Sequence, residues 1–362
     1  MLHGSSLPGI VRAAVIAAIC GSASLVSAQE HVTVRSDILF YGDNTEFRNP
    51  FREGETIFGA APRVAVVFGL GERVEIALGG FGNIRFGGDD AFDEAKPVIS
   101  LTFVGRRSTF VFGTLATPRA GRPAGPDRTG PHGLLPPIQR EMLAFDRPYE
   151  AGLSWTFKSE AVQQELWIDW QRVNTPEHRE RFDGGAMGKV RLTRWLAVPY
   201  NLHIVHEGGQ LFAAGPVADS SAVAAGFDVQ LPTGRWLDEA GLELYGLASR
   251  FVPDRGEPAR SRDGGAFFAR VAGERAGWRG HLIVWRGKHF IKDEGDLNYS
   301  SLQRDGGEWR GTRDYAEAGL TRTFVPVPDV LLEVSGRLHR IETHYEYSFR
   351  ILARAALSLK LR

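Results

Sequence analysis

Two histidines lie three residues apart in the segment His203-Ile-Val-His206, a spacing that invites comparison with a metal site. The apolar residues around them recur at every second position, at Leu196, Val198 and Tyr200. That period predicts a β-strand, on which side chains three residues apart point to opposite faces. We therefore expect His203 to face one side and His206 the other, so that they do not share a metal.

A second candidate for metal binding is the segment 41–55, YGDNTEFRNPFREGE. Asp43, Asn44 and Glu46 could offer closely spaced oxygen ligands to calcium. Asp and Asn are also ordinary turn residues. We favour the turn and predict that the protein holds no metal and no cofactor.

A third candidate is a nucleophile and its base. Ser335 and His339 are four residues apart and share a face of one predicted strand, which separates them by about 13 Å. That distance is too long for the hydrogen bond that activates a serine. The chain has no HExxH, no GxSxG and no phosphate-binding loop. A pair formed across neighbouring strands stays open, but nothing in the sequence singles one out, and we predict that the protein is not an enzyme.

The elements that must position these residues are strands. The chain ends in SFRILARAALSLKLR, where Phe349, Ile351 and Leu357 alternate with Arg350 and Ser358. Segments of about ten residues with the same period recur from residue 31 onward, and we count sixteen. Tight turns such as Arg106-Arg107 alternate with longer polar links, so every strand runs antiparallel to the next and the sheet has one short-turn end.

The first residues differ from the rest. Residues 1–28 combine a short basic start, an apolar run from Ala13 to Cys20 and the small residues Val26-Ser27-Ala28. This pattern predicts a secretory signal peptide cleaved after Ala28, leaving 29–362 as one domain. The apolar run is short for an N-terminal membrane anchor. The 43 basic and 43 acidic residues balance, so no basic surface indicates nucleic acid.

Taken together, these features resemble a Gram-negative outer-membrane β-barrel with a porin-like layout. The resemblance rests on pattern, not on a signature motif, and fits no single family. It implies an all-β fold: a transmembrane antiparallel up-and-down β-barrel of about 16 strands with a long third external loop. It also implies contact with outer-membrane lipid and periplasmic termini, while leaving the oligomeric state open. The chain departs from the usual pattern by ending in Leu361-Arg362 and not in an aromatic residue.

The phase of the strands assigns many charged side chains to the inward face. A sixteen-stranded barrel is wide enough to hold water, so such charges can be hydrated, paired or presented to a solute. The inward charges that we expect to line the lumen are Lys189, Arg191, Asp228, Glu243, Arg270, Arg279, Glu317, Glu333, Arg337, Arg350 and Arg354.

The longest link, Thr117–Pro148, carries seven prolines that forbid a continued ladder. In porins the third external loop folds into the barrel, and by that resemblance we expect this segment to narrow the lumen, with a short helix near 138–143. An external cap is the alternative. If the segment narrows the lumen, its charged residues face the pore: Arg119, Arg122, Asp127, Arg128, Arg140, Glu141, Asp146 and Arg147.

These features favour a channel that passes a small hydrophilic solute or a secreted polymer such as a polysaccharide. Inward aromatics such as Trp167 and Trp285 would suit sugar faces, although packing against the third loop explains them equally well. The alternatives are a plugged structural, adhesion or assembly barrel whose loops carry the function, and a surface hydrolase with a Ser–His pair.

Overall fold

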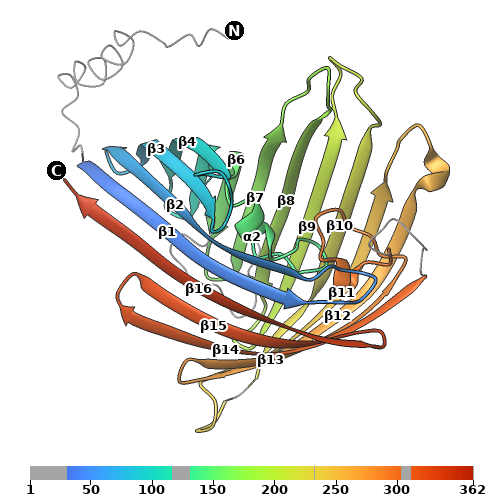
Figure 1. Cartoon of the computed structure of the whole chain (residues 1–362). Coiled ribbons are helices and arrows are strands. Elements are labelled where there is room, and N and C mark those ends of the chain that lie inside the picture. Colours follow the sequence, from blue (N-terminus) through green and yellow to red (C-terminus); the bar gives the residue numbers. More distant parts are fainter. Residues whose placement is uncertain (1–30, 116–130, 232, 303–310, 362) are drawn as a thin grey trace.

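The protein forms a closed β-barrel in a computed structural model, which describes residues 31–115, 131–231, 233–302 and 311–361. The predicted signal peptide, residues 1–28, lies outside the described residues. Sixteen strands make up the barrel, as the alternating pattern predicted (Figure 1). Their bounds are β1 His31–Glu46, β2 Glu55–Leu70, β3 Val74–Arg85, β4 Glu94–Val104, β5 Ser108–Thr114, β6 Ala151–Lys158, β7 Val162–Arg172, β8 Glu180–Arg191, β9 Leu196–Gly208, β10 Ala218–Gln230, β11 Glu239–Val252, β12 Arg262–Arg275, β13 Trp278–Lys288, β14 Thr312–Val327, β15 Val330–Ile341 and β16 His344–Lys360.

Each strand pairs antiparallel with its sequence neighbours, and β1 pairs with β16 to close the sheet. Thr33 lies opposite Lys360, so the start of β1 and the end of β16 meet at one end of the barrel, as Figure 1 shows. Closure satisfies the backbone hydrogen bonds of both edges, which a sheet in lipid requires. No described helix is both long enough and apolar enough to cross a membrane.

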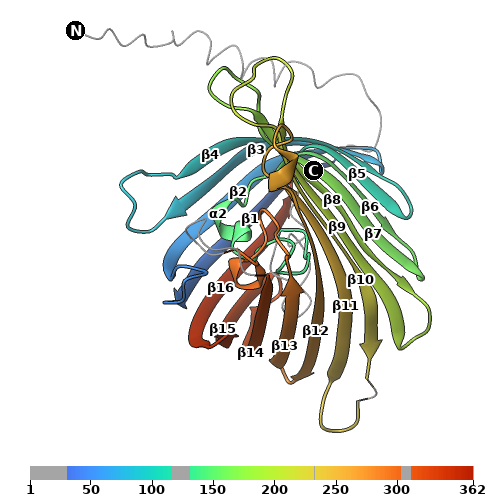
Figure 2. The ribbon, with the colours of Figure 1, turned by 90° about the vertical axis from the view of Figure 1, so that its right-hand side faces the viewer.

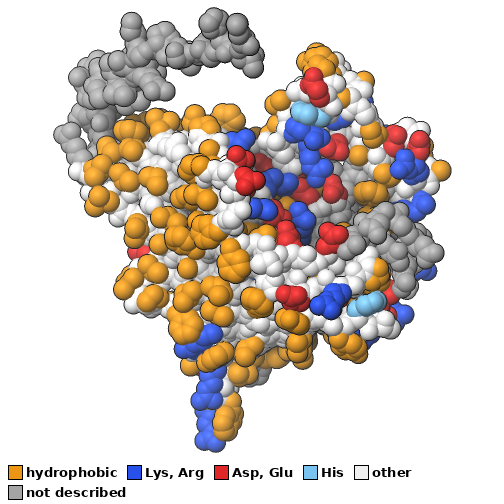
Figure 3. All heavy atoms as spheres, viewed as in Figure 1, with side chains coloured by type: hydrophobic (Ala, Val, Ile, Leu, Met, Phe, Trp, Pro, Cys, Tyr) orange, Lys and Arg blue, Asp and Glu red, His pale blue; other side chains and the backbone are white. Residues whose placement is uncertain are grey.

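The outer wall is mostly apolar, because many of the outward residues are aliphatic or aromatic. On β16 the outward Phe349, Ile351 and Leu357 are 45, 43 and 57% exposed, whereas Arg350 is 8% exposed. Figure 3 shows hydrophobic side chains spread over the outer wall and charged side chains gathered in the hollow of the barrel. The alternation at the C-terminus therefore separates a lipid-facing side from a polar interior.

The interior is filled by inward side chains and by two links that fold between the strands, residues 131–150 and 289–302. Leu134, Leu135 and Ile138 of the first link are fully buried against Tyr245 and Trp285 of the wall. The second link adds the short helix η2, Leu297–Tyr299. Figure 2 shows α2 and this second link inside the ring of strands. The inward aromatics thus pack against the links, which is one of the two interpretations given above beside contact with sugar faces.

Two local expectations need adjustment. The helix of the first link, α2, spans Leu143–Asp146, later than the expected 138–143, because residues 134–142 around Pro136 and Pro137 form turns. Strand β1 continues to Glu46, since Asp43, Asn44 and Glu46 pair with β16 across the closing seam. The three residues are therefore strand residues, not the turn that the sequence suggested.

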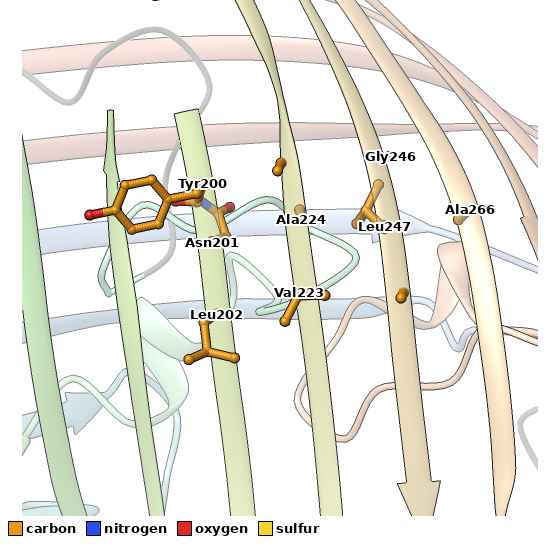
Figure 4. Close-up of a pocket in the computed structure, with 10 residues that line it drawn as sticks. Tyr200, Asn201, Leu202, Val223, Ala224, Gly246, Leu247 and Ala266 are labelled. Atoms are coloured by element: carbon orange, nitrogen blue, oxygen red, sulfur yellow. The ribbon is translucent and has the colours of Figure 1, made fainter. Parts of the chain in front are cut away.

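A shallow hollow of about 590 Å³ lies on the outer wall over β9–β12 (Figure 4). Small outward residues open it, among them Ala225, Gly246 and Ala248, and Leu202 and Val223 flank it. Among the residues that line it there is no acidic side chain, no basic side chain and no histidine. The hollow offers apolar contact but no catalytic group, so the chemistry must be sought inside the barrel.

Candidate functional site

A serine and a histidine meet inside the barrel on neighbouring strands. Ser348 of β16 and His339 of β15 are hydrogen-bonded, with 2.8 Å between Oγ and Nε2. The register of the two strands brings them together, because Ser348 lies opposite Arg337 and His339 lies opposite Glu346. The two side chains are therefore diagonal neighbours on the inward face, within reach of each other.

The other side of His339 fixes the tautomer of its ring. Its Nδ1 lies 2.8 Å from the hydroxyl oxygen of Tyr315, and that hydroxyl donates to Glu317 Oε2 at 2.5 Å. Since the Tyr315 hydrogen is used on Glu317, its oxygen accepts from Nδ1–H, and Nε2 is left to accept from Ser348. Glu317 Oε2 is also 3.5 Å from Nδ1. The arrangement is a serine, a base and a carboxylate joined through a tyrosine.

Glu317 is held from two further directions. His281 of β13 lies with Nε2 2.8 Å from Glu317 Oε1, and Arg337 Nη1 lies 3.7 Å from the same oxygen. Glu317 is 6% exposed, so these partners compensate for the burial of its charge. A fixed carboxylate in turn stabilises the positive charge that His339 would acquire on taking a proton.

Two arginines line the same cavity as Ser348 and His339. Arg337 and Arg350 both donate to Glu141 Oε2, at 2.9 and 2.7 Å, and Arg350 also pairs with Asp43. Fixed cations beside a nucleophile can stabilise the negative charge that develops on a carbonyl oxygen. The free space in this cavity is about 30 Å³, which is room for a few water molecules at most.

Residues from three links between strands cover the cavity. Phe47 lies edge-on to the His339 ring with the centroids 5.0 Å apart, and Asn49 donates to Glu346 at 2.5 Å. Glu141 and Met142 reach the cavity from the link before β6, and Asp296 and Asn298 from the link before β14. A substrate larger than water can therefore reach Ser348 only if these links move apart.

Most of the charges expected to line the lumen are paired with an opposite charge. Arg270 donates to Glu243 at 2.7 Å and Arg279 to Glu333 at 3.4 Å, and Lys189 lies 3.9 Å from Asp228. Glu317, Arg337 and Arg350 belong to the serine–histidine cavity, and Arg354 donates to Asp37 at 2.9 Å from Nε to Oδ1. Arg191 is exposed at the end of β8. Whether any of them borders a water path stays a prediction.

The charged residues of the long link divide into two groups. Arg119, Arg122, Asp127 and Arg128 lie outside the described residues. Arg140 lies 3.4 Å from Asp146, and Asp146 also accepts from Arg85 at 2.9 Å. Glu141 faces the serine–histidine cavity, and Arg147 donates to Asp183 and Glu294 at 3.2 and 2.9 Å. The described part of the link is thus tied to the wall by ion pairs.

A second buried cluster surrounds His132 of the same link. Its Nδ1 lies 2.9 Å from Glu165 and its Nε2 3.1 Å from Glu150, and its ring stacks on Trp167 with 3.8 Å between centroids. Burial alone would lower the pKa of His132, but the carboxylates of Glu150 and Glu165 outweigh it and raise that pKa well above its usual value. A charged His132 therefore joins the described start of the link to its end at Glu150 and to Glu165 of β7.

The sequence did not single out Ser348, although Glu317 was expected in the lumen. Serine and histidine were compared along one strand, where Ser335 and His339 are too far apart. One feature of the sequence could have indicated the pair. Ser348 lies four residues after the short turn that joins β15 to β16, and a short turn fixes which residues of the two strands face each other.

Comparison with solved structures defines the class of protein. Solved structures of OpdQ from Pseudomonas aeruginosa, of a loop-deletion mutant of OmpT from Vibrio cholerae and of an anion-selective porin from Comamonas acidovorans have TM-scores of 0.51, 0.55 and 0.53. They cover 92, 91 and 91% of this chain and 98, 99 and 100% of their own chains, at 10, 9 and 10% sequence identity. The chain therefore has the fold of a porin-like outer-membrane β-barrel, as its alternating strands indicated.

A family model then gives the family. The model described as lipid A 3'-O-deacylase-type matches residues 25–361, and the chain belongs to that family. Among curated proteins, none matches the chain. The expectation that the protein is not an enzyme was wrong, because the family is one of enzymes. The comparison along one strand considered Ser335 and His339, whereas the register of β15 and β16 brings Ser348 to His339.

Proposed function

We propose that this protein is an ester hydrolase of the outer membrane that removes an acyl chain from lipid A, as the name of its family describes. The hydrogen-bonded series Ser348–His339–Tyr315–Glu317 is the observation that carries the proposal. A serine that donates to a histidine, itself oriented by a buried acid, is the arrangement that acyl transfer uses.

The reaction follows from the positions of these groups. Ser348 Oγ attacks the ester carbonyl while His339 Nε2 takes its proton, and Arg337 and Arg350 offset the charge on the carbonyl oxygen. The sugar oxygen then leaves with the proton from His339, and the acyl chain remains on Ser348. Water, deprotonated by His339, attacks this second ester, the fatty acid leaves, and His339 returns the proton to Ser348 Oγ.

The position of Ser348 along β16 suits a lipid substrate. It lies four residues from the turn before β16, about 13 Å along the strand, and therefore near the loop end of the barrel. The links at 47–54, 131–150 and 289–302 would open to admit the ester and close to exclude water. We further propose that residues 1–28 are removed as a signal peptide and that both termini face the periplasm, since β1 begins where β16 ends.

A second candidate function is passage of a small hydrophilic solute or of a polymer such as a polysaccharide, narrowed by 117–148. The observation that favours it is the row of charge pairs between β8 and β15, among them Arg270–Glu243 and Arg279–Glu333, on a porin-like barrel. Such a row could order a solute along the wall.

The two functions are distinguished with the purified full chain in vesicles that contain lipid A. Mass spectrometry of the lipid after incubation should show loss of one acyl chain, from the 3' position. Loss from another position would keep the hydrolase and change its specificity. Unchanged lipid together with steady conductance in a planar bilayer would overturn the proposal in favour of the channel.

A further inference from the structure

Three metal-ligating side chains meet at a second place inside the barrel, where no step of the proposed hydrolysis occurs. Asp183 comes from β8, His203 from β9 and Glu294 from the link before β14. His203 Nε2 lies 3.7 Å from Asp183 Oδ1 and 4.0 Å from Glu294 Oε2. The three ligand atoms are all within 4.8 Å of one another.

The histidine at this place is buried without a hydrogen bond. His203 is 0% exposed, and neither of its ring nitrogens has a hydrogen-bond partner in the described part of the chain. Glu294 Oε2 likewise has no hydrogen-bond partner among the described residues. Buried polar atoms that stay unsatisfied cost stability, so atoms aimed at one point indicate a group that binds there.

Neighbouring side chains hold the two carboxylates in position through their other oxygens. Arg147 and Gln171 donate to Asp183 Oδ2 at 3.2 and 2.7 Å, and Arg147 and Arg181 donate to Glu294 Oε1 at 2.9 and 3.1 Å. Asp183 Oδ1, which also accepts from Trp167 Nε1 at 3.1 Å, and Glu294 Oε2 are the carboxylate oxygens nearest His203 Nε2. Partners of this kind orient the ligands in protein metal sites.

We propose that Asp183, His203 and Glu294 bind a divalent transition metal of the zinc type. A tetrahedral zinc ion with ligands at about 2.0–2.1 Å separates its ligand atoms by roughly 3.4 Å. The two measured separations exceed this by a few tenths of an ångström, which side-chain rotation can supply. One imidazole and two carboxylates form a ligand set that zinc accepts, with water in the fourth position.

The cations nearby set the expected strength and role of the site. Arg147, Arg181 and Lys292 surround the carboxylates, so the metal should bind less tightly than in a site of anions alone, and a chelator should remove it. Because its ligands come from β8, β9 and the link before β14, the metal would fasten that link inside the barrel. The role is structural and does not depend on the hydrolase proposal.

The test uses the refolded full chain in detergent, stripped with a chelator and titrated with Zn²⁺. We expect one Zn²⁺ per chain by isothermal titration and by metal analysis after gel filtration. Cobalt in its place should give the visible absorption of a tetrahedral site. The His203→Gln variant should weaken binding by at least about tenfold.

The matched control is His206→Gln, on the same strand but hydrogen-bonded to Asp219 at 2.7 Å and away from the cluster. This control should bind like the wild type. If His203→Gln does not fold, Glu294→Gln keeps the side-chain shape and should weaken binding in the same way. Absence of stoichiometric Zn²⁺, or equal binding by wild type and both cluster variants, would overturn the proposal.

Discussion

Ser348 Oγ and His339 Nε2 are 2.8 Å apart across the β15–β16 pair, so the contact joins side chains of two neighbouring strands. Because Tyr315 fixes the opposite nitrogen of the ring, His339 is poised to take a proton from the serine. The proposed deacylase activity rests on this contact.

Tyr315→Phe should slow the reaction without weakening substrate binding. The change removes the acceptor of His339 Nδ1–H but leaves Ser348 in place, so we expect kcat to fall by roughly 10- to 100-fold while KM is unchanged. Steady-state kinetics measure both constants. Tyr200→Phe on the outer wall, which removes only a hydrogen bond to Gln164, is the control. An equal loss in the control would contradict the role given to Tyr315.

Glu141→Gln should destabilise the barrel. The carboxylate accepts from both Arg337 and Arg350 inside the cavity. Its loss removes one negative charge that both guanidinium groups share. We expect the free energy of unfolding in urea to fall by about 3 kcal/mol. The exposed Glu177→Gln should leave it unchanged. A stability equal to wild type in Glu141→Gln would mean that the link is not anchored through this carboxylate.

Ile351→Arg should impair insertion far more than Leu359→Arg. Both residues point outward on β16, but Ile351 lies near the middle of the strand and Leu359 near its end. The cost of arginine in the lipid-facing wall is about 2–4 kcal/mol at the midplane and about 0–1 kcal/mol near the interface. Folding into vesicles, followed by gel mobility, measures the difference. Equal effects at both positions would contradict the placement of β16 across the bilayer.

Stability should fall as the pH rises above neutral, through His132. Its pKa is raised in the folded protein, where burial opposes the charge but Glu150 and Glu165 outweigh it. The native state therefore keeps a proton that the unfolded chain releases near its ordinary pKa of about 6.5. The stabilisation is complete below that value and is lost as the pH rises through the raised pKa. Unfolding between pH 6 and pH 9 should show a smaller slope in His132→Gln, and identical slopes would contradict this origin.

The fold could be predicted because the lipid and the interior impose a period of two on every strand. Phe349, Ile351 and Leu357 must face lipid, and that requirement is visible in the sequence without any partner. The site could not be predicted in the same way. The pairing of Ser348 with His339 depends on the register between two strands, and that of His203 with Glu294 on where a link folds. Neither leaves a periodic signal.

The central claim is that Ser348 is the nucleophile of a deacylase. Its most direct test compares fatty acid release from lipid A by the wild type, Ser348→Ala and Ser335→Ala, all refolded in the same vesicles. Ser335 is also inward on β15 but is not hydrogen-bonded to His339, so its loss should leave the rate near that of the wild type. We expect release by the wild type and by Ser335→Ala, and a loss of at least about 1,000-fold in Ser348→Ala. Release by Ser348→Ala at the wild-type rate would contradict it.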